Sequence, residues 1–85
     1  MRQNSRKIVR GRLATIEGQI RGLMQMIEDG RESKDVLTQI SAVRAALDSV
    51  GSIVISDHVE ELASTSRLTP ETRSTLKSMI KTFLQ

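Results

Sequence analysis

The sequence predicts an all-α protein of three helices, with one long helix at the centre of the chain. The apolar residues recur at alternating spacings of four and three, which places them on one helix face, and no stretch alternates with the period of two that is typical of strands. The chain has 85 residues with 38% hydrophobic side chains and a single aromatic one, so one protomer has little material for a thick core. We therefore expect one domain, residues 1–85, that completes its core by self-association.

A first helix is predicted over about residues 5–29. Asn4 or Ser5 is expected to cap it, because short polar side chains accept hydrogen bonds from the free amides of a first helical turn. Its apolar stripe is regular and consists of Val9, Leu13, Ile16, Ile20, Leu23 and Ile27. Gly30 is expected to end the helix, since glycine readily adopts the left-handed conformation that follows a last turn.

A second, longer helix is predicted over about residues 33–63, with Ser33 as its cap. At 1.5 Å per residue it would be about 45 Å long, which is more than the first helix alone can cover. Its main apolar stripe repeats the spacing of the first helix and consists of Val36, Ile40, Val43, Leu47, Val50 and Val54. A second apolar line through Leu37, Ala46 and Ile53 predicts burial on two sides, and therefore a neighbouring protomer.

A third, short helix is predicted over about residues 70–84. Thr69 is expected to cap it, Pro70 suits the first helical position, and Glu71 is an acid near the positive end of the helix dipole. The apolar face of this helix consists of Leu76, Met79, Ile80 and Phe83.

The charge of the chain is modestly basic and unevenly distributed. The formal net charge is +3, and the first twelve residues hold five bases and no acid. Such a run favours a polyanionic partner such as nucleic acid, although a merely solvated helix face is the simpler alternative. Because Trp and Tyr are missing, binding of single strands by base stacking is disfavoured. The sequence shows no apolar run long enough to span a membrane and no secretory signal, so we expect a cytoplasmic protein.

Two stretches carry a resemblance to a known family. IEGQIRG at residues 16–22 and DVLTQISAVRAAL at residues 35–47 together resemble the copper-sensing operon repressors of the CsoR type and their nickel/cobalt-responsive and formaldehyde-responsive relatives. The resemblance implies a three-helix protomer, an antiparallel dimer with a four-helix-bundle core, and a dimer of dimers. It also implies a transcriptional repressor that binds double-stranded DNA without a winged or helix-turn-helix reader and is released by an effector.

The arrangement of the bases agrees with a duplex partner. Arg6, Arg10 and Arg21 follow spacings near multiples of 3.6 and share one face of the first helix. Glu17 is the one acid on that face and can pair with Arg21 at the i,i+4 spacing. Repeated across a symmetric tetramer, these charges would give many phosphate contacts and a steep salt dependence. The candidate DNA contacts are Arg6, Lys7, Arg10, Arg12, Arg21 and Arg44, of which Arg10, Arg21 and Arg44 are the primary ones.

The effector site that the resemblance implies has lost its sulfur ligands. The family has a cysteine at the start of the second helix, where this chain has Ser33; the family's histidine is matched by His58; and the third ligand position is Leu62. Cu(I) is soft and requires thiolates, so copper sensing is disfavoured, as are persulfide formation and formaldehyde capture at a thiol. We therefore expect a different effector, with Ser33, His58, Glu61 and Leu62 as the remnant of the site.

His58 leaves three alternatives open. It can be a packing residue at the edge of the apolar stripe, a titrating group in a sensing cavity, or a ligand for a divalent metal together with nearby carboxylates. The carboxylates in question are Glu60, Glu61 and, across a dimer seam, Glu32.

An enzyme is not expected, because the chain has no thiol and only one histidine, with no convincing nucleophile beside it. The runner-up function is a helical oligomerisation or interaction module that does not bind DNA, including mixed assemblies with a cysteine-bearing relative. A weak metal-binding protein that uses His58 and carboxylates comes third.

Overall fold

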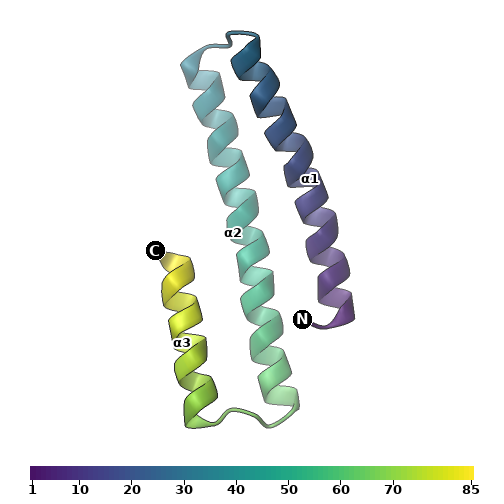
Figure 1. The fold of residues 1–85 in the computed structure, drawn as a ribbon, viewed down its shortest axis with the longest axis vertical. Coiled ribbons are helices and arrows are strands. Elements are labelled where there is room, and N and C mark those ends of the chain that lie inside the picture. Colours follow the sequence, from purple (N-terminus) through teal and green to yellow (C-terminus); the bar gives the residue numbers. More distant parts are fainter.

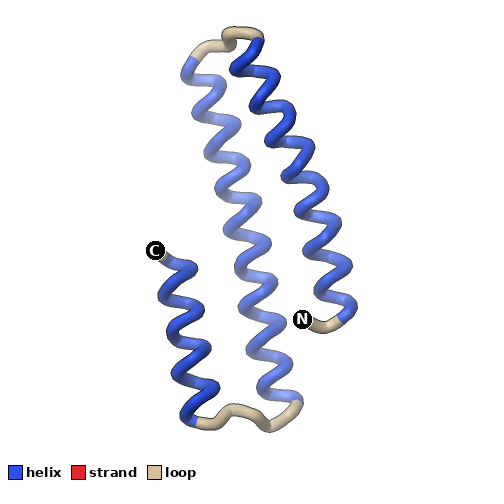
Figure 2. The backbone as a smooth tube through the Cα atoms, in the orientation of Figure 1, coloured by secondary structure: helices blue, strands red, loops and turns tan.

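The computed structural model describes all 85 residues and contains three α-helices and no strand. The helices are α1 (Gln3–Glu28), α2 (Ser33–Ser64) and α3 (Pro70–Leu84). α1 and α2 form an antiparallel hairpin, and α3 turns back along the C-terminal half of α2, on the side away from α1 (Figure 1). Figure 2 shows that only short loops and the chain ends lie outside the helices. The protomer is thin, with extents of 53 × 26 × 12 Å. The expected all-α class with a long central helix is confirmed.

The core lies along the seam between α1 and α2. Its buried members are Val9 and Ile16 from α1 and Val43 and Val50 from α2. The apolar stripe of α1 is only partly used, because Leu13 and Ile20 belong to it and are nevertheless 43% and 42% exposed. A heptad stripe is wider than the contact that one neighbouring helix makes, so the remaining part of the stripe faces outward.

The start of α1 differs from the prediction. The helix begins at Gln3, Arg2 occupies the N-cap position, and the Arg2 side chain makes no capping hydrogen bond. The expected cap at Asn4 or Ser5 is wrong, since both residues lie inside the helix. The reason is tertiary: the carboxylate of Asp57 on α2 accepts a hydrogen bond from the backbone N–H of Arg2 at 3.3 Å, and this contact holds the chain at the beginning of α1.

The turn between α1 and α2 agrees with the prediction on one side only. Gly30 has a φ of 68°, and the amides of Gly30 and Arg31 bond back to carbonyls in the last turn of α1 at 3.1 and 3.0 Å. This double closure is typical of helices that end at a glycine. Ser33 is the first residue of α2 but not its cap, because Glu32 occupies the N-cap position and no side chain caps the helix. The expected Ser33 cap is therefore wrong.

The start of α3 follows the prediction. The Thr69 hydroxyl accepts a hydrogen bond from the backbone N–H of Thr72 at 3.2 Å, the Thr72 hydroxyl accepts one from the N–H of Thr69 at 2.8 Å, and Pro70 follows the cap. α3 contacts α2 alone and has no buried residue. Its Phe83 ring lies against Gly51 of α2, where an added Cβ would be only 2.2 Å from the ring.

Candidate nucleic-acid interface

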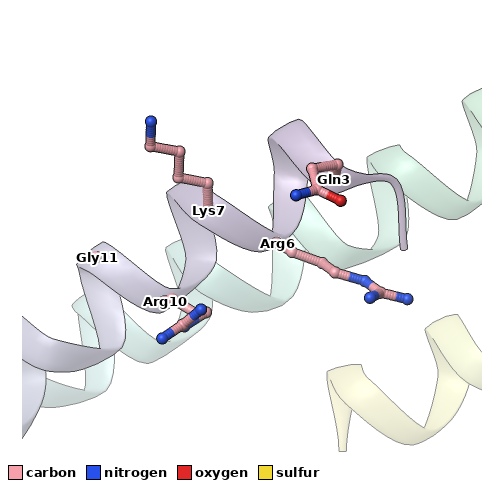
Figure 3. Close-up of a pocket in the computed structure, with 5 residues that line it drawn as sticks. All are labelled: Gln3, Arg6, Lys7, Arg10 and Gly11. Carbon is pink, nitrogen blue, oxygen red and sulfur yellow. The ribbon is translucent and has the colours of Figure 1, made fainter.

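Three basic side chains from the first turns of α1 gather around one shallow hollow. Arg6, Lys7 and Arg10 line it together with Gln3 and Gly11, and no hydrophobic residue contributes (Figure 3). The spacing i, i+3, i+4, i+7 and i+8 is that of a single helix face. In Figure 3 the Lys7 side chain extends away from the guanidiniums of Arg6 and Arg10, so the three charges spread around the hollow. We call Arg6, Lys7 and Arg10 the basic cluster.

The charges of the basic cluster are not neutralised within the protomer. None of its members takes part in the four ion pairs of the structure. The Nε of Arg6 donates to the backbone carbonyl of Met1 at 2.9 Å, which orients this guanidinium without cancelling its charge. All three residues are exposed. Unpaired cations on a polar helix face attract polyanions.

The other predicted DNA contacts lie outside the basic cluster. Arg12 reaches toward α2, where its Nη1 donates to the Ser49 hydroxyl at 3.1 Å. Arg21 is exposed farther along α1 and pairs with Glu17 at 3.7 Å, at the i,i+4 spacing that the sequence indicated. Arg44 is exposed on α2 and makes no ion pair. The structure therefore brings three of the six candidates together and leaves the other three separate.

Sequence reasoning missed an ion-pair cluster that ties the beginning of α1 to α2. Asp57 is the only buried charged residue, with a side chain that is 1% exposed. Its Oδ1 accepts a hydrogen bond from Arg2 Nε at 2.9 Å, and Arg2 pairs with Glu60 as well. Hydrogen bonds lower the pKa of Asp57 to about 2. The largest contribution comes from the Ser5 hydroxyl and the next from Arg2. Hydrogen bonds to Glu60 and Asp57 raise the pKa of Arg2 above its ordinary value.

The sequence did contain a signal for this cluster. Asp57 follows Val43 and Val50 at intervals of seven, so a carboxylate stands at a position of the core stripe. A buried carboxylate needs hydrogen-bond donors or a cation, because burial without them is costly. The donor is Arg2, one of the five bases in the first twelve residues. In the structure the charge of Arg2 is satisfied by α2, so Arg2 is not a free cation like the members of the basic cluster.

The remnant of the effector site is not assembled within one protomer. Ser33 opens α2 and lines a hollow beside the end of α1. His58 is half-buried roughly 25 residues further along the same helix, or about 37 Å away at 1.5 Å per residue. Glu61 is half-buried and Leu62 is buried, one turn beyond His58. No group of three His, Cys, Asp or Glu residues is placed to hold a metal ion. A ligand that contacts both Ser33 and His58 would need two protomers.

A second exposed surface is apolar and runs along α1 and α2. Its large side chains are between 42% and 64% exposed. They are Leu13, Ile20, Met24 and Ile27 on α1, and Leu37 and Leu47 on α2. None of the helices has the length and hydrophobicity that crossing a bilayer requires. Exposed apolar side chains in this number are typical of interaction surfaces.

Comparisons with known proteins place the chain among metal-responsive regulators. The model of the family described as "Metal-sensitive transcriptional repressor" matches residues 5–85. The copper-sensing transcriptional repressor CsoR of Bacillus subtilis is 32% identical over 75 residues, which are 88% of this chain and 74% of that protein. The copper-sensing transcriptional repressor RicR of Mycobacterium tuberculosis is 50% identical over 48 residues, which are 56% of this chain and 50% of RicR.

Two solved structures are similar over almost the entire chain. The copper-sensing repressor CsoR with Cu(I) from Geobacillus thermodenitrificans has a TM-score of 0.86 and 33% identity, with 100% of this chain and 92% of that chain covered. The nickel-responsive transcriptional regulator InrS has a TM-score of 0.80 and 34% identity, with 91% and 90% covered. The resemblance that residues 16–22 and 35–47 indicated is confirmed in both sequence and fold.

Proposed function

Since the chain belongs to the family of metal-sensitive transcriptional repressors, we propose that it is a repressor that binds double-stranded DNA and responds to an effector other than a thiolate-bound metal. The observation that carries the proposal is the basic cluster, in which three cations surround a polar hollow and none is paired with an acid. On this proposal the protein is a cytoplasmic regulator and not an enzyme.

The chemistry of the basic cluster suits the phosphate backbone of a duplex. A guanidinium such as that of Arg6 or Arg10 can bond a phosphate through two N–H groups, and Lys7 adds a compact positive charge. Phosphate contacts position a protein on DNA, whereas base contacts give it sequence specificity. Arg21 and Arg44 are exposed and would extend the contact beyond the hollow, and Arg12 would do so after releasing Ser49.

Self-association is part of the proposal. The apolar surface of α1 and α2 is exposed in the protomer, and a second copy placed antiparallel would cover it and form a four-helix bundle. A dimer of dimers would then carry four basic clusters, so that one assembly could make phosphate contacts through more than one of them. Sedimentation or light scattering should detect a dimer or tetramer, and a monomer at micromolar concentration would contradict this part.

The decisive experiment is duplex binding by the purified protein over a series of salt concentrations. The probes are duplexes from the region upstream of the protein's own gene and a mixed-sequence duplex of equal length. We expect affinity to fall steeply as salt rises, because phosphate contacts release counterions. Replacing Arg6, Lys7 and Arg10 together by alanine should reduce the affinity for every duplex and flatten the salt dependence.

A control variant removes the same number of positive charges from another helix. Replacing Arg73, Lys77 and Lys81 of α3 by alanine removes the same three charges at the other side of the protomer. If both triple variants lose the same affinity, net charge alone governs binding and the assigned surface is wrong. If the unaltered protein binds no duplex, the second candidate function is favoured. This function is a helical interaction module that pairs with a related chain through the exposed apolar surface.

The effector is proposed to differ from those of the relatives. CsoR and RicR are named as copper-sensing and InrS as nickel-responsive, whereas this chain contains no cysteine, which disfavours Cu(I). The alternative is a divalent ion held by His58, Glu61 and another protomer's Glu32. Calorimetric titration with Zn(II), Ni(II) and Co(II) tests it, because identical heats for the unaltered protein and His58→Ala would exclude that site.

A further inference from the structure

We propose that Asp57 is a positioning residue for DNA binding: it lies on α2, touches no DNA, and holds the first turns of α1 so that the basic cluster keeps its geometry. The inference rests on the proposed function. It assigns a role to the one buried charged residue of the chain, which neither the DNA surface nor the remnant effector site uses.

The contacts of Asp57 converge on the first residues of α1. Its Oδ1 accepts from the Arg2 Nε at 2.9 Å and its Oδ2 from the Arg2 backbone N–H at 3.3 Å. The same Arg2 side chain pairs with Glu60, one turn further along α2. Arg6 in turn donates to the carbonyl of Met1 at 2.9 Å. Met1 and Arg2 are thereby fixed on both sides, and Arg6 of the basic cluster is directly attached to them.

α1 has no capping group of its own at its first turn. Its N-cap residue makes no side-chain cap, and no acid lies in its first turn. Instead Arg2, Arg6 and Lys7 stand at the end of the helix where the peptide dipole is already positive, which is unfavourable for the helix. The carboxylate of Asp57 lies at this end and supplies from α2 both the negative charge and the acceptor that a cap normally provides.

The basic cluster occupies the turns that this contact holds. Arg6 and Lys7 lie in the second turn of α1 and Arg10 in the third. Fraying of the first turns would let these side chains separate, and ordering them again on DNA would weaken binding. Asp57 therefore acts through Arg2 on the geometry of the basic cluster, although its own charge has the sign that DNA repels.

The positioning role and simple electrostatics predict opposite changes in the affinity for DNA. Asp57→Asn raises the net charge by one, so electrostatics alone predicts equal or tighter DNA binding. The positioning role predicts weaker binding, by roughly fivefold to tenfold, which is the size of effect that an N-cap has on a helix equilibrium. Asp48→Asn is the matched control, because Asp48 is an exposed acid of α2 with no ion pair and makes the same charge change.

The experiment measures duplex affinity and amide hydrogen exchange in the same variants. For Asp57→Asn we expect weaker binding than for Asp48→Asn, together with faster exchange at residues 6–10 and unchanged exchange at the turn between α1 and α2. Glu60→Gln gives a second reading if Asp57→Asn does not fold, because Glu60 is 64% exposed. Glu60→Gln should also weaken duplex binding, but by less than Asp57→Asn.

Arg2→Lys separates positioning from direct contact with phosphate. It keeps the positive charge but cannot bridge Asp57 and Glu60 with a fixed fork of donors, so affinity should fall between that of the unaltered protein and that of Asp57→Asn. Unchanged duplex affinity in Arg2→Lys would contradict the role of the guanidinium that bridges Asp57 and Glu60.

Equal or tighter binding by Asp57→Asn than by Asp48→Asn would overturn the inference, whether or not exchange becomes faster. Absence of duplex binding by the unaltered protein would overturn the proposed function instead. Hydrogen exchange would still decide the structural part in that case, because unchanged exchange at residues 6–10 in Asp57→Asn rules out the hold on α1.

Discussion

α1 and α3 are both amphipathic and both pack on α2, but α2 holds them very differently. α1 contributes Val9 and Ile16 to the core and adds an ion pair to the buried Asp57. α3 has a good N-cap and an apolar face, yet buries none of its residues. α2 presents the buried Val43 and Val50 to α1, whereas at Gly51 it presents no side chain to Phe83 of α3. Local helix signals therefore do not decide how firmly a helix is held; the facing surface does.

The largest effect should come from emptying the seam between α1 and α2. Ile16→Ala removes the most buried apolar side chain of the chain, 4% exposed, and should cost about 2–5 kcal/mol in the free energy of unfolding. Denaturant unfolding at fixed protein concentration measures it. Ile80→Ala in the half-buried face of α3 is the matched control, and an equal loss there would contradict the contrast between the two helices.

Acid should weaken the attachment of α1 and leave that of α3 unaffected. The folded-state pKa of Asp57 is about 2, below its ordinary value of 3.8, so the unfolded chain binds more protons between these values. The stabilisation by Asp57 is fully present only well above the unfolded-state pKa of 3.8 and is lost as the pH falls through that value toward about 2. Unfolding measured over this range should show a shallower decline in Asp57→Asn than in the unaltered protein. Parallel curves would mean that the ion pair contributes nothing.

A side chain at position 51 should loosen α3 alone. Gly51→Ala places a Cβ 2.2 Å from the Phe83 ring, so the ring must move, at a typical cost of about 1–3 kcal/mol. The higher helix propensity of alanine offsets about 1 kcal/mol of that cost. Amide exchange should become faster in α3 while α1 is unchanged.

The double variant sharpens this prediction. In a Phe83→Ala background Gly51→Ala should become stabilising by about 1 kcal/mol, because only the propensity gain is left. A destabilising effect in that background would show that the ring is not what excludes the side chain.

The smallest effect concerns the loop that leads into α3. Ser66 has a φ of 53°, and its amide and that of Arg67 bond back to Ala63 and Leu62 at 3.3 and 2.9 Å, the closure that normally ends in glycine. Ser66→Gly should therefore stabilise the end of α2 by up to about 1 kcal/mol. A thermal melt measures the gain, and Ser64→Gly, at the last residue of α2, should lower stability instead.

Much of the fold could be predicted from local patterns. The three helices, the glycine turn at Gly30 and the Thr69 cap each depend on residues within a few positions of one another. The same holds for the basic face of α1, because Arg6 and Arg10 are one turn apart. The caps expected at Asn4 and Ser33 were wrong because a short polar residue can cap wherever the chain happens to turn, and packing decides where that is.

The features of the candidate site also fall into those that the sequence determines and those that depend on tertiary packing. The sequence by itself determined that a cationic face exists, that the chain belongs with helical metal-responsive repressors, and that thiolate ligands are missing. Only the tertiary structure decided which cations are free, since Arg2 is satisfied by Asp57 and Arg12 reaches Ser49 while the basic cluster remains unpaired. The physical reason is range: helix periodicity is set by residues three and four apart, whereas Arg2 and Asp57 meet only because α1 packs antiparallel on α2.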